Sequence, residues 1–221
     1  MKRFFLYAPI ILLTLILFVS PFFIRAKIEC QSQYGECPAE IESGLMKLAP
    51  GSLIVLRNEV NSYLKKNYLV SSYSVQFKLP DIIQVDLIVK KPYFAIKSST
   101  TGGIGLVDNK GIILSLVDST PLPTLVTQEP ISKPGQVVSN QDLFALNLIL
   151  GMNAMYQINY GTIMNDSLVV DMNTGVRVIF PLEGDDQVLL GAVRLIYTKV
   201  TSNYLGTYSQ IDMRYKNPVL R

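Results

Sequence analysis

The sequence YSVQFKLPDIIQVDLIV, residues 73–89, decides the fold of the first part of the chain. Apolar and polar residues alternate on both sides of its Pro-Asp dipeptide, which is typical of two strands that each bury one face and are joined by a turn. We therefore predict two consecutive strands, 70–79 and 82–89. Pro92 follows almost directly and marks a domain boundary.

The residues before this strand pair predict one more strand and two helices. Residues 28–33 have the pattern of a short strand. Residues 38–49 predict a helix that starts at a proline and ends before Pro-Gly, and RNEVNSYLKKN, 57–67, carries the apolar stripe of a second helix. The element order is then β-α-α-β-β, within one domain of residues 26–91.

Residues 92–221 predict a second domain with a mixed α/β fold dominated by an antiparallel sheet. Its glycine-rich stretches lack the Gly-Lys-Ser/Thr of a phosphate-binding loop, so we interpret them as hairpin turns. The proline-rich stretch 121–135 predicts an irregular crossing. The expected strands are 93–97, 104–107, 112–117, 167–172, 176–180 and 208–215, the last continued by Val219 and Leu220, and the expected helices are 143–156 and 185–203.

Residues 4–24 form a run of 21 residues without a charged side chain. A helix of that length spans about 31 Å, close to the hydrocarbon thickness of a bilayer. A cleaved signal peptide usually has a shorter apolar core and small residues at its cleavage site, which this run lacks. We therefore expect one transmembrane helix after a cytoplasmic tail of residues 1–3, with both domains outside the cytoplasm. The expected fold class is α+β.

Charge argues against a nucleic-acid partner. Four of the 20 basic residues flank the apolar run, namely Lys2, Arg3, Arg25 and Lys27, and the other 16 are balanced by 17 acidic residues. A nucleic-acid-binding domain would concentrate positive charge on its folded part. The chain also contains no histidine, which excludes Ser-His-Asp and Cys-His nucleophiles and zinc sites built from imidazole.

The acidic side chains do not indicate catalysis either. Asp185-Asp186 precedes a predicted helix, where carboxylates cap free amide groups, and Asp108 lies in a predicted turn. No Ser-x-x-Lys motif is present. We therefore expect neither an enzyme nor a cofactor, metal or small-molecule substrate, and we interpret the protein as a binding surface.

Cys30 and Cys37 are the two cysteines of the chain, in CQSQYGEC. They could close a small disulfide loop in an oxidising compartment, for which chain entropy predicts about 2.5 kcal/mol of stabilisation. Two free thiols and half of a metal site are the alternatives. The spacing is not the C-x-x-C of thioredoxin-like proteins.

Several motifs resemble the FtsQ/DivIB family of bacterial cell-division proteins, along almost the whole chain. The passage V-Q-F-K-L-P followed by I-Q-V, within 75–85, is similar to the family's "V-x-R/K-x-x-P-x-x-L-x-V". VDNKG at 107–111 matches its "VD-x-x-G", and LPTL at 122–125 matches its "LP-x-L". IDMRY at 211–215 resembles the family's "ID-L-R-Y" and is the most specific match; in contrast, Lys90-Lys91-Pro92 replaces its Glu-Arg-Pro.

This resemblance implies a POTRA domain at 26–91, an FtsQ-type β domain at 92–221, and a division scaffold in the cell membrane at the septum. It implies that single-pass coiled-coil proteins of the FtsB/DivIC and FtsL types bind the end of the β domain and are thereby linked to septal wall synthesis. The implied contact residues are Asp212, Met213, Arg214, Tyr215, Lys216 and Asn217. Two alternatives remain open: the Asp212–Arg214 pair only stabilises the last strand, or the protein is a POTRA-bearing envelope-assembly or translocation component that acts on client proteins.

Overall fold

The computed structural model describes residues 25–48, 51–202 and 208–221. The chain divides between Lys90 and Lys91 into two compact units, which we call unit 1 and unit 2. The boundary expected from the sequence lay between residues 91 and 92. Each unit buries its own cluster of apolar side chains, so each is described by itself.

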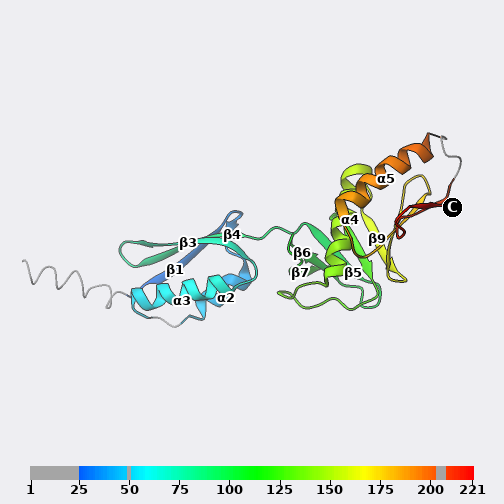
Figure 1. The fold of residues 1–221 in the computed structure, drawn as a ribbon. Coiled ribbons are helices and arrows are strands. Elements are labelled where there is room, and N and C mark those ends of the chain that lie inside the picture. Colours follow the sequence, from blue (N-terminus) through cyan, green and yellow to red (C-terminus); the bar gives the residue numbers. More distant parts are fainter. Residues whose placement is uncertain (1–24, 49–50, 203–207) are drawn as a thin grey trace, which may run out of the picture. The chain divides into compact units, whose positions relative to one another are not determined.

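Unit 1 packs two helices against one face of a four-stranded sheet (Figure 1). The strand order is β2-β1-β4-β3; β1 and β4 are parallel, and the other neighbouring pairs are antiparallel. Its elements are β1 (Lys27–Ser32), β2 (Gly35–Glu36), α2 (Ala39–Met46), α3 (Leu53–Lys66), β3 (Val70–Lys78) and β4 (Ile82–Val89). The short strand β2 was not expected from the sequence.

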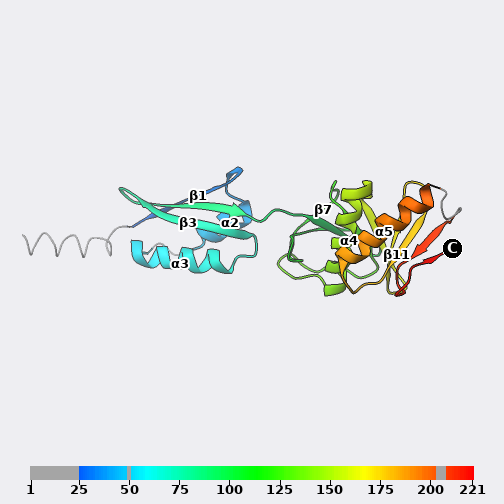
Figure 2. The same ribbon diagram turned by 45° about the horizontal axis from the view of Figure 1, so that its top comes forward.

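The core of unit 1 follows from two periodicities. Alternate residues of β4, among them Ile83 and Val85, are fully buried and face the helices. Apolar residues also recur every four positions along α3 and are buried against the β4 side chains, namely Leu56, Val60 and Leu64. Both described helices of unit 1 lie on this one face of its sheet (Figure 2).

Unit 2 contains a nine-stranded sheet in the order β13-β12-β11-β10-β9-β8-β5-β6-β7. Its strands are β5 (Phe94–Ser98), β6 (Ile104–Val107), β7 (Ile113–Val117), β8 (Thr124–Thr127), β9 (Tyr160–Met164), β10 (Ser167–Asp171), β11 (Arg177–Phe180), β12 (Gln210–Asp212) and β13 (Val219–Leu220). The pairs β5–β8, β8–β9 and β11–β12 are parallel, and the others are antiparallel.

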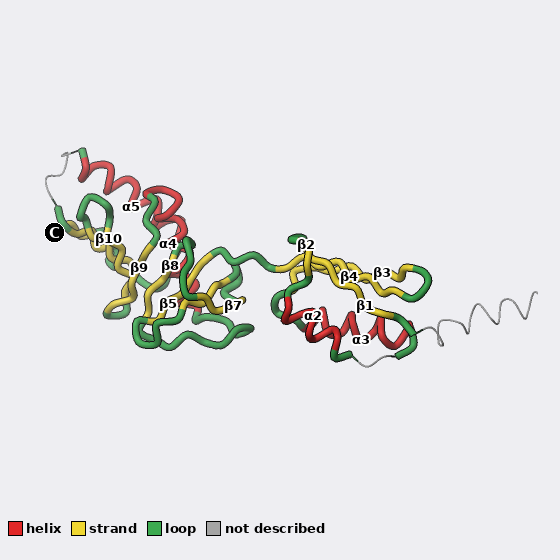
Figure 3. The backbone as a smooth tube through the Cα atoms, turned by 180° about the vertical axis from the view of Figure 1, so that it is seen from behind, coloured by secondary structure: helices red, strands yellow, loops and turns green. Residues whose placement is uncertain are grey.

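Two helices, α4 (Asn140–Tyr156) and α5 (Asp186–Thr201), pack on one side of this sheet, as the view from behind shows (Figure 3). Helix α4 is apolar over most of its surface, and Leu146, Leu148, Ile149 and Met152 are fully buried. It therefore contributes the centre of the core of unit 2 and contacts both the sheet and α5.

The fold class expected from the sequence needs correction. The described residues form an α+β fold, but none of their helices is long and apolar enough to cross a membrane. The expected transmembrane helix, 4–24, lies outside the described residues. Both sheets are mixed, so the description of the second domain as dominated by antiparallel pairing overlooked its three parallel pairs.

Two central strands of unit 2, β8 and β9, were not expected. Residues 124–127 were interpreted as part of an irregular crossing because prolines surround them. In the structure, this short segment pairs in parallel with both β5 and β9, with Leu125 fully buried. Prolines just outside a short strand do not disturb its hydrogen bonds, and pairing on both sides outweighs the local pattern.

Candidate partner-binding site

The six predicted contact residues lie at the last hairpin of unit 2. Asp212 ends β12, and residues 213–218 form the loop that leads to β13 at one edge of the sheet. The predicted strand 208–215 is therefore wrong in length, since only Gln210–Asp212 is extended and paired. The strand stops because the Asp212 carboxylate accepts a hydrogen bond from the backbone N–H of Arg214, at 3.2 Å, which turns the chain.

An ion pair between the buried Asp212 and the partly exposed Arg214, whose side chain is 37% exposed, holds this loop. The Asp212 side chain is fully buried, and its two carboxylate oxygens accept hydrogen bonds from Arg214 Nε at 2.9 Å and Nη2 at 2.7 Å. The other terminal nitrogen of Arg214 lies 3.5 Å from the Ser167 hydroxyl, on β10. Arg214 therefore holds the loop against two strands with a geometry that only a planar guanidinium provides.

Electrostatics in this pair agree with the geometry. Hydrogen bonds from the Arg214 guanidinium lower the pKa of Asp212 below its ordinary value, although burial alone would raise it. The same contact raises the pKa of Arg214. The pair is therefore ionised at neutral pH and stabilises the conformation of the loop.

The remaining predicted residues divide by exposure. Met213 is 4% exposed and belongs to the core of unit 2, so its side chain is not available to a partner. Tyr215 is 53% exposed, and Lys216 and Asn217 are also exposed. The loop thus presents an aromatic ring with a cation and an amide beside it.

Strand β13 offers backbone groups beside the loop. Gln210 and Arg221 exchange two hydrogen bonds of 3.0 Å, and the next pair in register is Ile211 with Leu220. In an antiparallel ladder, hydrogen-bonded pairs alternate with pairs that are not hydrogen-bonded, so Ile211–Leu220 is of the second kind. The backbone groups of a pair of this kind point away from the partner strand. The N–H and C=O of Leu220 therefore face the open edge of the sheet, while its side chain packs against the core.

Two residues that support the loop were missed in the sequence. Ser167 contacts Arg214, and the carbonyl oxygen of Ile179 accepts a hydrogen bond of 2.8 Å from the backbone N–H of Met213. Both lie in strands far from the hairpin in sequence. Only the strand order brings them together, so no local pattern could have identified them.

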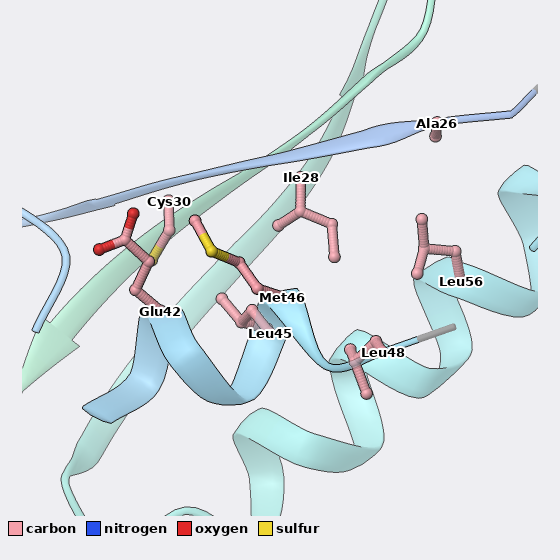
Figure 4. Close-up of a pocket in the computed structure, with 8 residues that line it drawn as sticks. All are labelled: Ala26, Ile28, Cys30, Glu42, Leu45, Met46, Leu48 and Leu56. Atoms are coloured by element: carbon pink, nitrogen blue, oxygen red, sulfur yellow. The ribbon is translucent and has the colours of Figure 1, made fainter. Parts of the chain in front are cut away.

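Cys30 and Cys37 form a disulfide that joins β1 to the residue after β2. Cys30 also lines a cavity of about 260 Å³ between β1 and the helices (Figure 4). Apolar side chains such as Ile28 and Leu45 surround it, and Glu42 is the only ionisable residue among the described residues that line it. The complete lining is Ala26, Ile28, Cys30, Glu42, Leu45, Met46, Leu48 and Leu56.

The acidic residues considered as catalytic candidates have structural roles. Asp185 caps α5 by accepting a hydrogen bond of 3.1 Å from the N–H of Val188, and Asp186 accepts one from Gln187. Asp108 accepts hydrogen bonds from two N–H groups of its own turn. The described residues also contain no cluster of three or more acidic or cysteine side chains suited to a metal ion.

No protein-family model matches this chain, and no curated protein sequence is significantly similar to it.

Proposed function

We propose that the protein is a non-enzymatic scaffold of the bacterial division machinery, similar to FtsQ/DivIB. It binds coiled-coil proteins of the FtsL and FtsB/DivIC types at the septum, outside the cytoplasm, and links them to septal wall synthesis. The observation that carries this proposal is the exposed Tyr215, held beside an open sheet edge by the internal Asp212–Arg214 pair. Exposed aromatic anchors and free strand edges are common elements of protein interfaces.

The binding mode follows from these two features. A strand of the partner adds to β13 through the outward N–H and C=O of Leu220, while Tyr215 supplies side-chain contacts at the end of the added strand. Arg214 acts by positioning the loop, since its guanidinium is occupied by Asp212 and Ser167. This assignment differs from the expectation that Arg214 is itself a contact residue.

Unit 1 supports the same proposal. Its strands β1, β3 and β4 and its two helices follow the β-α-α-β-β order of a POTRA domain, with β2 added at the edge. The Cys30–Cys37 disulfide supports a location outside the cytoplasm, because disulfides persist in oxidising compartments.

The test uses the full chain and the outer segments of the host's FtsL-like and FtsB-like proteins. Complex formation is measured by size-exclusion chromatography with light scattering, in mild detergent because of the apolar stretch 4–24. Tyr215→Ala is expected to weaken binding about tenfold or more while the circular dichroism spectrum stays unchanged. Tyr160→Ala is the matched control, because Tyr160 is 63% exposed in the same unit but lies on β9.

Absence of a complex between folded wild-type proteins would contradict the proposal. Equal loss of binding in Tyr215→Ala and Tyr160→Ala would contradict the assignment of the site. Both variants replace a tyrosine by alanine, so only the position of the tyrosine differs between them.

A second function is favoured by one observation in unit 1. Strand β3 is a nine-residue edge strand with a single charged residue, Lys78. A groove of about 540 Å³ runs between it and α3, and Phe77 on β3 and Ile54 on α3 line it with partly exposed apolar side chains. Such an edge can accept an extended client segment, as an envelope-assembly component would require.

The two functions are separated by Phe77→Ser. As an envelope-assembly component, the protein would lose binding of an extended, unfolded client polypeptide with this change and keep it with Tyr215→Ala. As a division scaffold, it would show the opposite pattern toward the coiled-coil partners. Binding is measured by fluorescence anisotropy with labelled client or partner segments.

A further inference from the structure

Helix α5 exposes an apolar line on the side opposite its core contacts. Leu190 and Val193 are buried against the rest of unit 2. The opposite face of the helix carries three residues spaced by three and four positions, namely Val188, Gly191 and Leu195. Val188 is 66% exposed and Leu195 is 68% exposed. In Figure 2, no other described element of unit 2 is drawn in front of α5.

Gly191 in the middle of this line has no packing explanation among the described residues. A Cβ atom added there would meet nothing within 4 Å, so the glycine does not make room for any described neighbour. Gly151 in α4 provides the contrast, because a Cβ there would collide with the side chain of Leu190. Glycine disfavours a helix interior, and a partner helix that approaches closely is one physical reason to keep it.

The charges beside this line have one sign. Arg194 and Lys199 are exposed next to Leu195, and neither belongs to an ion pair among the described residues. The acidic residues of the helix, Asp185 and Asp186, are confined to its first turn, where they cap backbone N–H groups. A partner that binds the middle and end of this face would therefore bind more favourably if it carried carboxylates beside its apolar side chains.

We propose that the line Val188–Gly191–Leu195 is a docking surface for an amphipathic helix whose apolar seam is flanked by acidic residues. Coiled-coil helices, the partners named in the proposed function, have an apolar seam with charged residues beside it, and the inference rests on that function. The partner helix packs its seam between Val188 and Leu195 and approaches the α5 backbone at Gly191. Its carboxylates face Arg194 and Lys199.

The test titrates the full chain, in mild detergent, with the same coiled-coil outer segments used above. The double variant Val188→Ser/Leu195→Ser is expected to raise the Kd about tenfold or more. Leu116→Ser and Met164→Ser are matched controls, because these side chains are 55% and 51% exposed on strands of the same unit. Both controls should keep the Kd within about twofold of the wild type, as expected outside an interface.

Two further variants keep the test independent of folding. Gly191→Gln introduces a better helix former at an open position, so the Tm should stay equal or rise while the Kd increases. Arg194→Glu should weaken binding at low salt, with a smaller effect at high salt because charges on the surface are screened.

The outcomes separate this inference from the proposed function. If the wild-type chain forms the complex and the double variant and Gly191→Gln bind within twofold of it, α5 is not a docking surface and only the inference fails. If the wild-type chain forms no complex, the proposed function and the inference that rests on it both fail.

Discussion

Two aspartate–arginine pairs of unit 2 have similar hydrogen-bond geometry but different burial. In each pair, two arginine nitrogens donate to the two oxygens of the carboxylate. The Asp212 side chain is fully buried beside Arg214, whereas the Asp171 side chain is 64% exposed beside Arg177. When an exposed ion pair is lost, water replaces the lost hydrogen bonds, so stability changes little. When a buried carboxylate is lost, water does not replace its hydrogen bonds, so the loss of stability is larger.

We therefore expect Asp212→Asn to lower the free energy of unfolding by about 1.5–3 kcal/mol at pH 7, the range for a hydrogen bond to a charged group. The matched control, Asp171→Asn, should cause a much smaller loss. Urea unfolding followed by circular dichroism measures both values. Equal losses in the two variants would show that burial of Asp212 does not strengthen its pair.

The Asp212 pair also predicts a dependence of stability on pH. The folded-state pKa of Asp212 is lowered, so the unfolded chain takes up this proton first as the pH falls. The stabilising contribution is complete above the unfolded pKa of about 4 and is lost as the pH falls below it toward the lower folded pKa. The stability difference between wild type and Asp212→Asn should thus shrink below pH 4, as measured by urea unfolding at several pH values. A difference that grows in acid would contradict the assignment.

At the scale of secondary-structure elements, glycines in the two helices of unit 2 have opposite roles. A Cβ atom on Gly151 of α4 would lie 2.9 Å from Cδ2 and 3.1 Å from Cγ of Leu190 on α5, so this glycine lets the two helices pack. Gly191 of α5 faces open space. The same substitution is therefore expected to act in opposite directions.

Gly151→Ala should lower the free energy of unfolding by about 1–3 kcal/mol, because the added methyl group overpacks the helix interface. Gly191→Ala should raise it by about 0.5–1 kcal/mol, because alanine is the better helix former and nothing obstructs it. Thermal and urea unfolding of the two variants provide the comparison. A stabilising Gly151→Ala would mean that Leu190 can move aside without cost.

The sequence predicted elements well where one pattern runs through many residues. The expected helix 143–156 is observed as Asn140–Tyr156, and the strands around Pro80-Asp81 are observed as β3 and β4. It failed where tertiary pairing decides, as for β8, whose four residues between prolines become a strand because β5 and β9 flank them. The candidate site shows the same limit: Tyr215 was predicted as a contact residue from a motif and stays a prediction, whereas Ser167 reaches Arg214 only through the sheet order.

At the scale of the whole molecule, the two units have separate apolar cores and one of them has a covalent crosslink. The core of unit 1 is built from α2, α3 and β4, and that of unit 2 from α4, α5 and its own sheet. The Cys30–Cys37 disulfide lies entirely within unit 1 and spans seven positions in sequence. Its loss should therefore destabilise unit 1 without changing the free energy of unfolding of unit 2.

We predict that Cys30→Ser/Cys37→Ser lowers the free energy of unfolding of unit 1 by about 2.5 kcal/mol, the chain-entropy value for a loop of this length. For a domain of this size, that loss corresponds to a Tm lower by about 10–20 °C. Differential scanning calorimetry should show one transition moving and the other staying in place. A reducing agent should reproduce the shift in the wild type and have no effect on the double variant. If both transitions moved together, the two cores would not unfold independently, and the effect of the disulfide would extend beyond the unit that contains it.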